Sequence, residues 1–457
     1  MNSRPERRPV VIDLFSGAGG LSLGLERAGF DVAVAVEQEA IHAATYAYNF
    51  PNTVVLNADV ATLKPELLRK AIVEGLRRHG RSPSQWDGEI DALAGGPPCQ
   101  GFSVIGKREA SEKRNKLVYA FCKLVETLRP RYFLMENVPG MAVGEQERIL
   151  RRLIKRFRAA GYELVNNGPQ LVNAADFGVP QDRSRLFFVG ARADVYTPGP
   201  VVREVPRFGF TAGVTVEEAI GDLPDADAYD SLRTQDGVEL SDAELITQLQ
   251  SASKYARLQL GVDVANDDLS YPRSFERNRL TCSLRTDHSK DVKKRFAATP
   301  RDGFEPISRY HRLSLDGRAN TIRAGTGPDH GSHTSARPIH PTKPRVITAR
   351  EAARLQSFPD WFLFHRTRWH AFRQIGNAVP PLLAHAVSKT IIDALDRKLK
   401  RPTTELSLKN DEFLDYSPSE AVAHFSRAAV AQPKRTGRAP QSEARGKQKR
   451  AAKSKSA

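Results

Sequence analysis

The chain of 457 residues carries 69 lysine and arginine residues against 53 aspartate and glutamate residues, a formal charge of +16. This length allows two or three domains, and three cysteines without a CxxC pair exclude a disulfide-stapled fold and disfavour a zinc ribbon. No apolar run approaches the roughly 18 residues of a membrane span, and the first residues lack the apolar core of a signal peptide. We therefore expect a cytoplasmic protein whose positive charge favours a polyanionic partner.

Residues 1–195 alternate between short apolar runs and amphipathic segments. The alternation predicts strands at 10–15, 31–36, 54–56, 90–93, 132–135 and 186–189, with helices at 21–28, 40–49, 64–79, 116–128 and 145–160. Such a sequence is typical of an α/β fold with a doubly wound, mostly parallel sheet and right-handed crossovers. We expect Gly29 to end the first helix.

The segment from Phe15 to Gly20, FSGAGG, links the first strand to the first helix. Its glycines let the backbone approach a ligand, and the helix N-terminus presents free N–H groups. Glu37 ends the second strand, where an acidic side chain meets ribose hydroxyls in such folds, and Asp59 ends the third. These features predict an adenosine-bearing ligand. The loop is not GxGxxG, so a glycine turn without a ligand stays the alternative.

Cys99 lies in the segment GGPPCQGFS at residues 95–103, directly after a predicted strand. A structural cysteine normally sits within an apolar pattern, whereas this polar, glycine-flanked loop is the setting of a nucleophile. Cys122 falls within an apolar helix pattern and Cys282 within the second half of the chain, and we expect both to be inert.

Glu136 ends another predicted strand, behind three apolar residues. This setting predicts a raised carboxyl pKa and a role in donating a proton near neutral pH. The segment QDRSR at 181–185 begins a strand, so Arg183 and Arg185 point to the same side. A pair of surface salt bridges is the alternative for these arginines.

The strand and helix rhythm stops after about residue 195 and returns at Thr348, an N-cap with Glu351 three residues later, before a last helix at 382–399. Between these limits, residues 201–270 hold 14 acidic and 5 basic side chains, whereas residues 271–340 hold 14 basic and 7 acidic. The second stretch is the better candidate for a polyanion-facing surface. Two complementary faces packed on each other are the alternative.

Taken in order, the motifs resemble the C5-cytosine-specific DNA methyltransferase family of prokaryotic modification type. They are DLFSGAGG (13–20), GGPPCQGFS (95–103), ENVPG (136–140), QDRSR (181–185), REAARLQSFP (350–359) and QIGNAVPP (374–381). The resemblance implies a Rossmann-like catalytic domain at 1–195 and 345–399. It places an inserted target-recognition domain at 196–344 and a C-terminal extension at 400–457.

The resemblance also implies a mechanism, in which Cys99 attacks C6 of a flipped-out cytosine. Glu136 would hold N3 and N4, and Arg185 would hold O2 with support from Arg183. The methyl donor would be S-adenosyl-L-methionine, with no metal. By resemblance its pocket is lined by Phe15, Ser16, Gly17, Gly19, Gly20, Leu21, Glu37, Asp59, Val60, Pro98, Asn377 and Ala378.

The implied partner is double-stranded DNA, with a cognate restriction endonuclease acting on the same site and a monomeric, nucleoid-associated enzyme. Residues 103–115 resemble the mobile loop that closes over the target base; a plain solvated loop is the alternative. Candidate DNA contacts are Gln100, Ser103, Lys107, Arg108, Arg114, Thr321 and Arg323.

Three other functions fit parts of the sequence. An RNA (tRNA) cytosine-5 methyltransferase would share the catalytic domain, but the large insert favours DNA. A catalytically silent DNA-binding protein is disfavoured by the intact set of Cys99, Glu136 and Arg185. A dinucleotide oxidoreductase would need neither Cys99 nor a basic insert.

Residues 434–457 hold nine lysine or arginine residues against Glu443 and lack large apolar side chains, which predicts a disordered tail. The tail is either a DNA-holding arm or a solubilising extension. If it is an arm, a protein without residues 434–457 binds DNA more weakly, and its affinity depends less steeply on salt. Binding isotherms at several salt concentrations measure this slope, and an unchanged slope supports the solubilising role.

Overall fold

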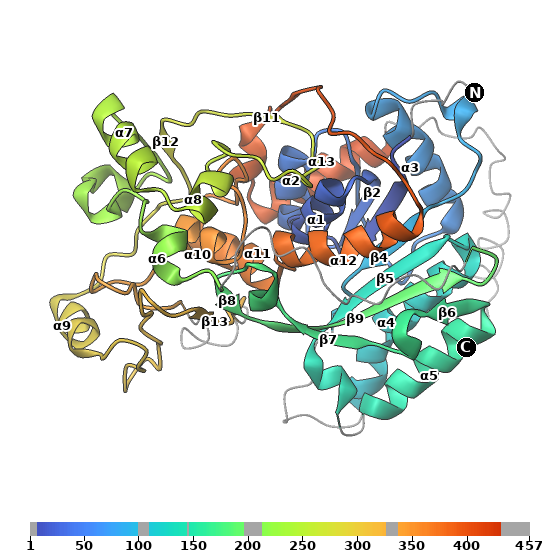
Figure 1. Cartoon of the computed structure of the whole chain (residues 1–457), viewed down its shortest axis with the longest axis horizontal. Helices are drawn as coiled ribbons and strands as arrows, with labels where there is room; N and C mark the ends of the chain where they lie inside the picture. Colours follow the sequence, from blue (N-terminus) through green and yellow to red (C-terminus); the bar gives the residue numbers. More distant parts are fainter. Residues whose placement is uncertain (1–6, 99–108, 144–145, 196–212, 326–336, 431–457) are drawn as a thin grey trace, which may run out of the picture.

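A mixed β-sheet forms the centre of the molecule (Figure 1). The computed structural model describes residues 7–98, 109–143, 146–195, 213–325 and 337–430. In this part of the chain the sheet has eight strands in the order β3-β2-β1-β4-β5-β9-β6, and β7 also pairs with β9. The strands are β1 (Val10–Leu14), β2 (Asp31–Glu37), β3 (Val54–Asn57), β4 (Ala92–Gly95), β5 (Tyr132–Asn137), β6 (Tyr162–Leu164), β7 (Gln170–Asn173) and β9 (Ser184–Arg192).

The first five strands are parallel, and β9 is antiparallel to β5, β6 and β7. Side chains of β1 alternate between two hydrophobic cores, with Val11 in one and Val10, Ile12 and Leu14 in the other. Because both faces are covered, the strands read as continuous apolar runs. The predicted doubly wound α/β sheet is therefore confirmed.

Helices cover the two faces of this sheet. One core is completed by α1 (Gly20–Ala28), α2 (Ala40–Asn49) and α12 (Pro381–Ala394). The other is completed by α3 (Pro65–Arg78), α4 (Glu109–Leu128) and α5 (Gln146–Ala159). Gly29 caps α1 with a φ of 116°, as predicted.

Three details differ from the prediction. Strands β6 and β7 were missed, because they are short, and β7 lacks the continuous burial of a central strand. Helix α4 begins at Glu109, so residues 109–115 of the predicted loop are helical, consistent with their content of alanine, glutamate, lysine and arginine. Helix α12 ends at Ala394 rather than 399, and Asp396 just beyond it has a positive φ of 50°.

The inserted segment has little regular structure and lies beside the sheet (Figure 1). Its elements are α6 (Val216–Ile220), β10 (Val238–Glu239), α7 (Asp242–Ser251), α8 (Lys254–Gln259), β11 (Arg273–Ser274), β12 (Arg279–Leu280), α9 (Lys290–Ala298) and β13 (Ala319–Asn320). Strand β13 pairs with β8 (Gln181–Asp182), which ties the end of this segment to the start of β9. Helices α10 (Ala349–Leu355) and α11 (Arg368–Asn377) follow, and α10 begins with the predicted Thr348–Glu351 capping box.

The described part of the C-terminal extension contacts both preceding regions. Strand β14 (Leu406–Ser407) pairs with β11, and α13 (Pro418–Val430) packs Ala421 against Ala40 and Ile41 of α2. No helix in the described ranges is long and apolar enough to cross a membrane.

The two ends of the fold meet where α1 packs on α12, close to Gly24. A Cβ on Gly24 would lie 2.2 Å from the Ala384 Cβ and 2.5 Å from the His385 backbone nitrogen. We expect Gly24→Ala to lower the free energy of unfolding by about 1–3 kcal/mol, because one of these close-packed helices must move. Urea denaturation measures the change. Gly168→Ala, where nothing lies within 4 Å, is the control, and equal stability of both variants would contradict the prediction.

Candidate active site

A cavity of about 500 Å³ opens at the carboxyl edge of the parallel strands, where the strand order reverses between β1 and β4. This is the position at which open α/β sheets bind their ligands. Ten of the twelve predicted cofactor residues line it: Phe15, Ser16, Gly17, Gly20, Leu21, Glu37, Val60, Pro98, Asn377 and Ala378. These ten residues come from segments at both ends of the chain.

Gly19 and Asp59 are not among the lining residues, contrary to the prediction. Gly19 is the N-cap of α1 and faces Phe50, since an added Cβ would lie 2.3 Å from that ring. The Asp59 carboxylate accepts a hydrogen bond from the Ala61 N–H at 2.8 Å, so it orders the turn after β3. Its neighbours, Ala58 and Val60, face the cavity instead.

Glu37 is held in place by backbone donors. Its two carboxylate oxygens accept hydrogen bonds from the N–H groups of Gly17 and Glu39, each at 2.8 Å. Burial raises the pKa of Glu37, and these two hydrogen bonds oppose the shift. A carboxylate has lone pairs beyond those two bonds, so Glu37 can also accept hydrogen bonds from ligand hydroxyls.

A buried chain of hydroxyls lies beneath the FSGAGG loop. The Tyr46 hydroxyl donates to Ser22 Oγ at 2.7 Å, and Ser22 Oγ donates to Asp13 Oδ2 at 2.5 Å. Burial raises the pKa of Asp13 to about 7. Since these residues come from α2, α1 and β1, the chain fixes the two helices against the strand that carries the loop.

Glu136 and Arg185 form an ion pair at the mouth of the cavity. The Arg185 Nε lies 2.8 Å from Glu136 Oε1, and both side chains are about seven-eighths buried. Burial raises the pKa of the Glu136 carboxyl, while the charges of Arg185 and Arg183 lower it. The raised pKa agrees with the prediction. The direct pair was not predicted, because the two residues lie on antiparallel strands β5 and β9.

The chain passes close over this carboxylate on its way to Cys99. A Cβ on Gly96 would lie 2.8 Å from Glu136 Oε2, so glycine permits the approach. The Asn137 side-chain amide donates to the Pro97 carbonyl at 3.3 Å. Pro98, which immediately precedes Cys99, lines the same cavity. Cys99 itself lies outside the described residues.

Arg183 and Arg185 both line the cavity, but they bind different partners. Its guanidinium is buried and donates to three backbone carbonyls, those of Ile322 at 3.1 Å, Gly376 at 2.8 Å and Ala378 at 2.9 Å. Burial, aided by the Arg185 charge, lowers its pKa well below the usual value. The residue therefore joins the QDRSR segment to the QIGNAVPP segment, and the alternative of a surface salt bridge is wrong.

Several lining residues were missed from the sequence. They include His42, Leu117, Val138, Arg373 and Gln374. Burial lowers the pKa of His42 to about 3, with the Arg373 charge as the second cause. Gln374 begins the QIGNAVPP segment and Arg373 immediately precedes it, so their position beside the motif could have indicated them. Nothing in the local pattern around His42 or Leu117 distinguishes them from core residues.

Most predicted DNA contacts lie outside the described residues: Gln100, Ser103, Lys107 and Arg108, as does the Arg114 side chain. Thr321 and Arg323 are exposed at the end of the inserted segment, and Thr321 Oγ1 donates to the Asp182 carbonyl at 2.7 Å.

The other two cysteines are fully buried, and burial raises the pKa of both thiols to about 12. Low thiolate content agrees with the predicted inert role of Cys122 and Cys282. No group of three or more potential metal ligands occurs among the described residues.

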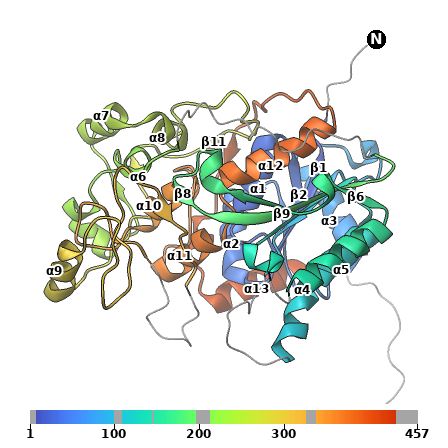
Figure 2. The same cartoon turned by 60° about the horizontal axis from the view of Figure 1, so that its bottom comes forward.

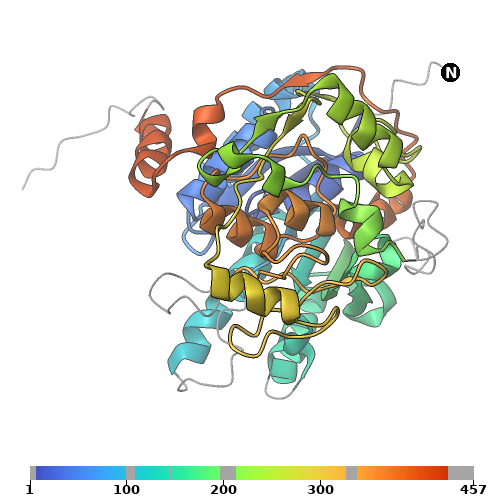
Figure 3. The same cartoon turned by 90° about the vertical axis from the view of Figure 1, so that its left-hand side faces the viewer.

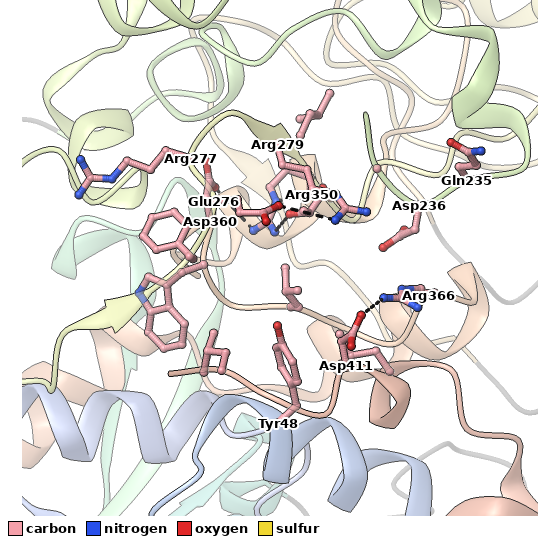
Figure 4. Close-up of a pocket in the computed structure, with 18 of the residues that line it drawn as sticks. Tyr48, Gln235, Asp236, Glu276, Arg277, Arg279, Arg350, Asp360, Arg366 and Asp411 are labelled. Atoms are coloured by element: carbon pink, nitrogen blue, oxygen red, sulfur yellow. Dashed lines mark hydrogen bonds and ion pairs between the residues drawn. The ribbon is translucent and has the colours of Figure 1, made fainter. Parts of the chain in front are cut away.

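A second cavity of about 920 Å³ lies between the inserted segment, α2 and the C-terminal extension (Figure 4). Its charged side chains mostly pair with each other. Arg350 lies 3.6 Å from Asp360, and Arg366 pairs with Asp411 at 3.0 Å and also with Asp415. Because these charges are matched within the cavity, we assign no ligand to it.

Comparison with known proteins agrees with this geometry. The family model for C-5 cytosine-specific DNA methylases matches residues 10–393. The chain belongs to this family. Its activity is therefore DNA cytosine-5 methylation with S-adenosylmethionine as the methyl donor.

Individual relatives cover nearly the whole chain. The type II methyltransferase M.XorII of Xanthomonas oryzae is 45% identical over 92% of this chain and 92% of its own. M.DdeI of Desulfomicrobium norvegicum is 31% identical over 83% of this chain and 88% of its own. The crystal structure of a prophage-encoded E. coli protein described as a DNA modification methyltransferase matches with a TM-score of 0.67 and 34% identity. It covers 85% of this chain and 100% of that one.

Arg183→Lys tests the link between the two segments. A single ammonium group cannot reach all three carbonyls, and a buried carbonyl without a donor costs about 1–3 kcal/mol. We expect at least tenfold weaker binding of S-adenosylhomocysteine, since Gly376 and Ala378 line the cavity. Titration calorimetry measures the affinity. Arg192→Lys, at the other end of β9, is the control, and equal affinity of both variants would contradict the link.

Proposed function

We propose that the protein methylates C5 of a cytosine within a specific site of double-stranded DNA, as the modification enzyme of a restriction-modification system. The observation that carries this proposal is the Glu136–Arg185 ion pair, which lines the same cavity as Pro98 and residues from both ends of the chain. The relatives named above are type II methyltransferases, which supports the assignment to modification. We place the enzyme in the cytoplasm at the nucleoid, acting as a monomer beside an endonuclease of the same specificity.

The cavity suits S-adenosylmethionine in shape and chemistry. Glu37 would accept hydrogen bonds from the ribose hydroxyls. Phe15 and Val60 would contact the adenine, and Asn377 and Ala378 would close the far side. Gly20 lets the backbone near Val379 pack closely against the loop on this side, because an added Cβ would lie 2.4 Å from the Val379 carbonyl oxygen. When bound, this donor supplies an electrophilic methyl group.

Cytosine C5 is a poor nucleophile, so we propose that the chain activates the ring from its other side. The Cys99 thiolate adds to C6, and the electron pair of the C5–C6 bond becomes available at C5 for the methyl group. Loss of the C5 proton then expels Cys99 and restores the aromatic ring. Because C6 is inaccessible within the duplex, the cytosine must first leave the stack, at a cost of a few kcal/mol.

Glu136 and Arg185 stabilise the charge that develops during this addition. Burial raises the pKa of Glu136, which favours donation of a proton to N3 as charge develops there, while its other oxygen accepts from N4. The Arg185 guanidinium has donors beyond the one facing Glu136, and these can bind O2. The ion pair keeps both groups aimed at one face of the cavity before the base arrives.

The test uses radiolabelled S-adenosylmethionine with either plasmid DNA or tRNA. We expect label on DNA from the wild type and from Cys122→Ala, and a loss of at least about 10³-fold in Cys99→Ala. Bisulfite sequencing of the plasmid then reads the target site. Label on tRNA alone would overturn the DNA substrate, and full labelling by Cys99→Ala would overturn the covalent mechanism.

A further inference from the structure

A β-hairpin at residues 300–312 follows α9 in the basic half of the inserted segment. Its arms form four backbone hydrogen bonds, between Asp302 and Arg312, Gly303 and Arg312, Glu305 and Tyr310, and Glu305 and Arg309, at 2.8–2.9 Å. Phe304 and His311 form an antiparallel bridge. The hairpin is therefore an ordered element held by its own backbone hydrogen bonds.

The polar side chains of the hairpin bind each other. Glu305 is fully buried, and its carboxylate lies 3.0 Å from Arg295 Nε of α9 and accepts the Ser308 N–H at 2.5 Å. His311 Nε2 lies 2.9 Å from Asp302 Oδ1. Glu305 is thus buried in an ion pair with α9, whereas the Asp302 carboxylate is 77% exposed beside His311.

Two large apolar side chains face solvent on this rigid frame. Phe304 is 61% exposed and Ile307 is 71% exposed, and Ile307 is the most exposed large apolar side chain of the described residues. Neither side chain fills a core. Keeping both apolar surfaces in contact with water on one ordered turn is unfavourable in free energy. Three exposed cations belong to the same part of the chain: Arg301 and Arg309 of the hairpin and Lys294 of α9.

The hairpin projects from the same side of the molecule as the start of α4, the helix that follows the Cys99 segment. Figure 3 shows α9 with the hairpin beneath it (gold) and the first turns of α4 (cyan) both at the lower side. In Figure 2, where this side comes forward, α9 lies at the left and the first turns of α4 lie at the bottom, right of centre. A duplex lying along this side of the molecule would contact both elements.

We propose that hairpin 300–312 enters a groove of the DNA and that Phe304 and Ile307 contact base edges there, with Lys294, Arg301 and Arg309 on the flanking phosphates. The proposal rests on the DNA methyltransferase function above and adds specificity-determining residues to it. Apolar side chains read thymine methyl groups or wedge against base steps, and cations beside them bind the backbone. These three cations would favour a protein partner only if that partner were acidic.

The test compares Phe304→Ala/Ile307→Ala with Ile246→Ala/Val264→Ala, two exposed apolar residues elsewhere in the inserted segment. The probes are a duplex with the site mapped by bisulfite sequencing and a duplex of equal length without it. We expect the hairpin variant to bind the site at least about tenfold more weakly, with unchanged binding to the second duplex and an unchanged melting temperature. The control variant should match the wild type.

Salt dependence separates the two kinds of contact. The apolar variant should keep the wild-type slope of affinity against salt, because it releases no counterions, whereas Arg301→Ala/Arg309→Ala should lower that slope by about 1–2. The maximal methylation rate of the apolar variant should stay within about threefold of the wild type. Wild-type affinity of the hairpin variant for the site would overturn this inference alone. Absence of DNA methylation by the wild type would overturn the proposed function as well.

Discussion

The buried guanidinium of Arg183 is the constraint on which the active site depends. It donates to carbonyls of Ile322, Gly376 and Ala378, which come from the end of the inserted segment and from the last catalytic motif. A buried cation without partners would cost several kcal/mol, so this arrangement persists only while all three segments stay together. Gln181 repeats the pattern, since it binds the Leu355 carbonyl and the Gln356 side chain, and Gln356 donates to Ala378.

These contacts of Arg183 explain why a cavity at one sheet edge can combine residues about 360 positions apart, from Phe15 to Val379. The FSGAGG loop follows β1, whereas Asn377 and Ala378 stand at the end of α11, just before α12. Packing of α1 on α12 brings them to the same edge, but packing alone is non-directional. The carbonyl contacts of Arg183 fix the register, and the neighbouring Arg185 then points toward Glu136 on the adjacent strand.

Sequence predicts the parts of this structure that depend on local pattern. Continuous apolar runs located the central strands, and acidic residues after them located Glu37 and Glu136 at the carboxyl edge. The pattern could not separate Arg183 from Arg185, because alternation along a strand says nothing about what lies opposite each side chain. His42 and Leu117 were missed for the same reason. Their role follows from where α2 and α4 pack, not from their neighbours in sequence.

The placement of the inserted segment depends on arginines at its boundary with the catalytic sheet. Arg273 is fully buried and binds both carboxylate oxygens of Glu26 on α1, at 2.5 and 2.9 Å. Arg354 of α10 does the same with Asp222, at 3.0 and 3.2 Å, and also binds Asp360. Replacing such pairs by apolar side chains often leaves stability unchanged or higher, so they are weak evidence for stability.

Bidentate pairs do restrict how the two partners are oriented, because a guanidinium donates two parallel hydrogen bonds to a carboxylate that lies in its plane. Apolar side chains of the inserted segment, such as Val216 and Tyr255, also join the core beside the sheet, but apolar contact alone is non-directional. Forked ion pairs at this boundary favour one orientation, and in that orientation hairpin 300–312 lies on the same side of the molecule as the start of α4. If the hairpin reads DNA as proposed, its position relative to the active site is therefore held by charges outside the hairpin itself.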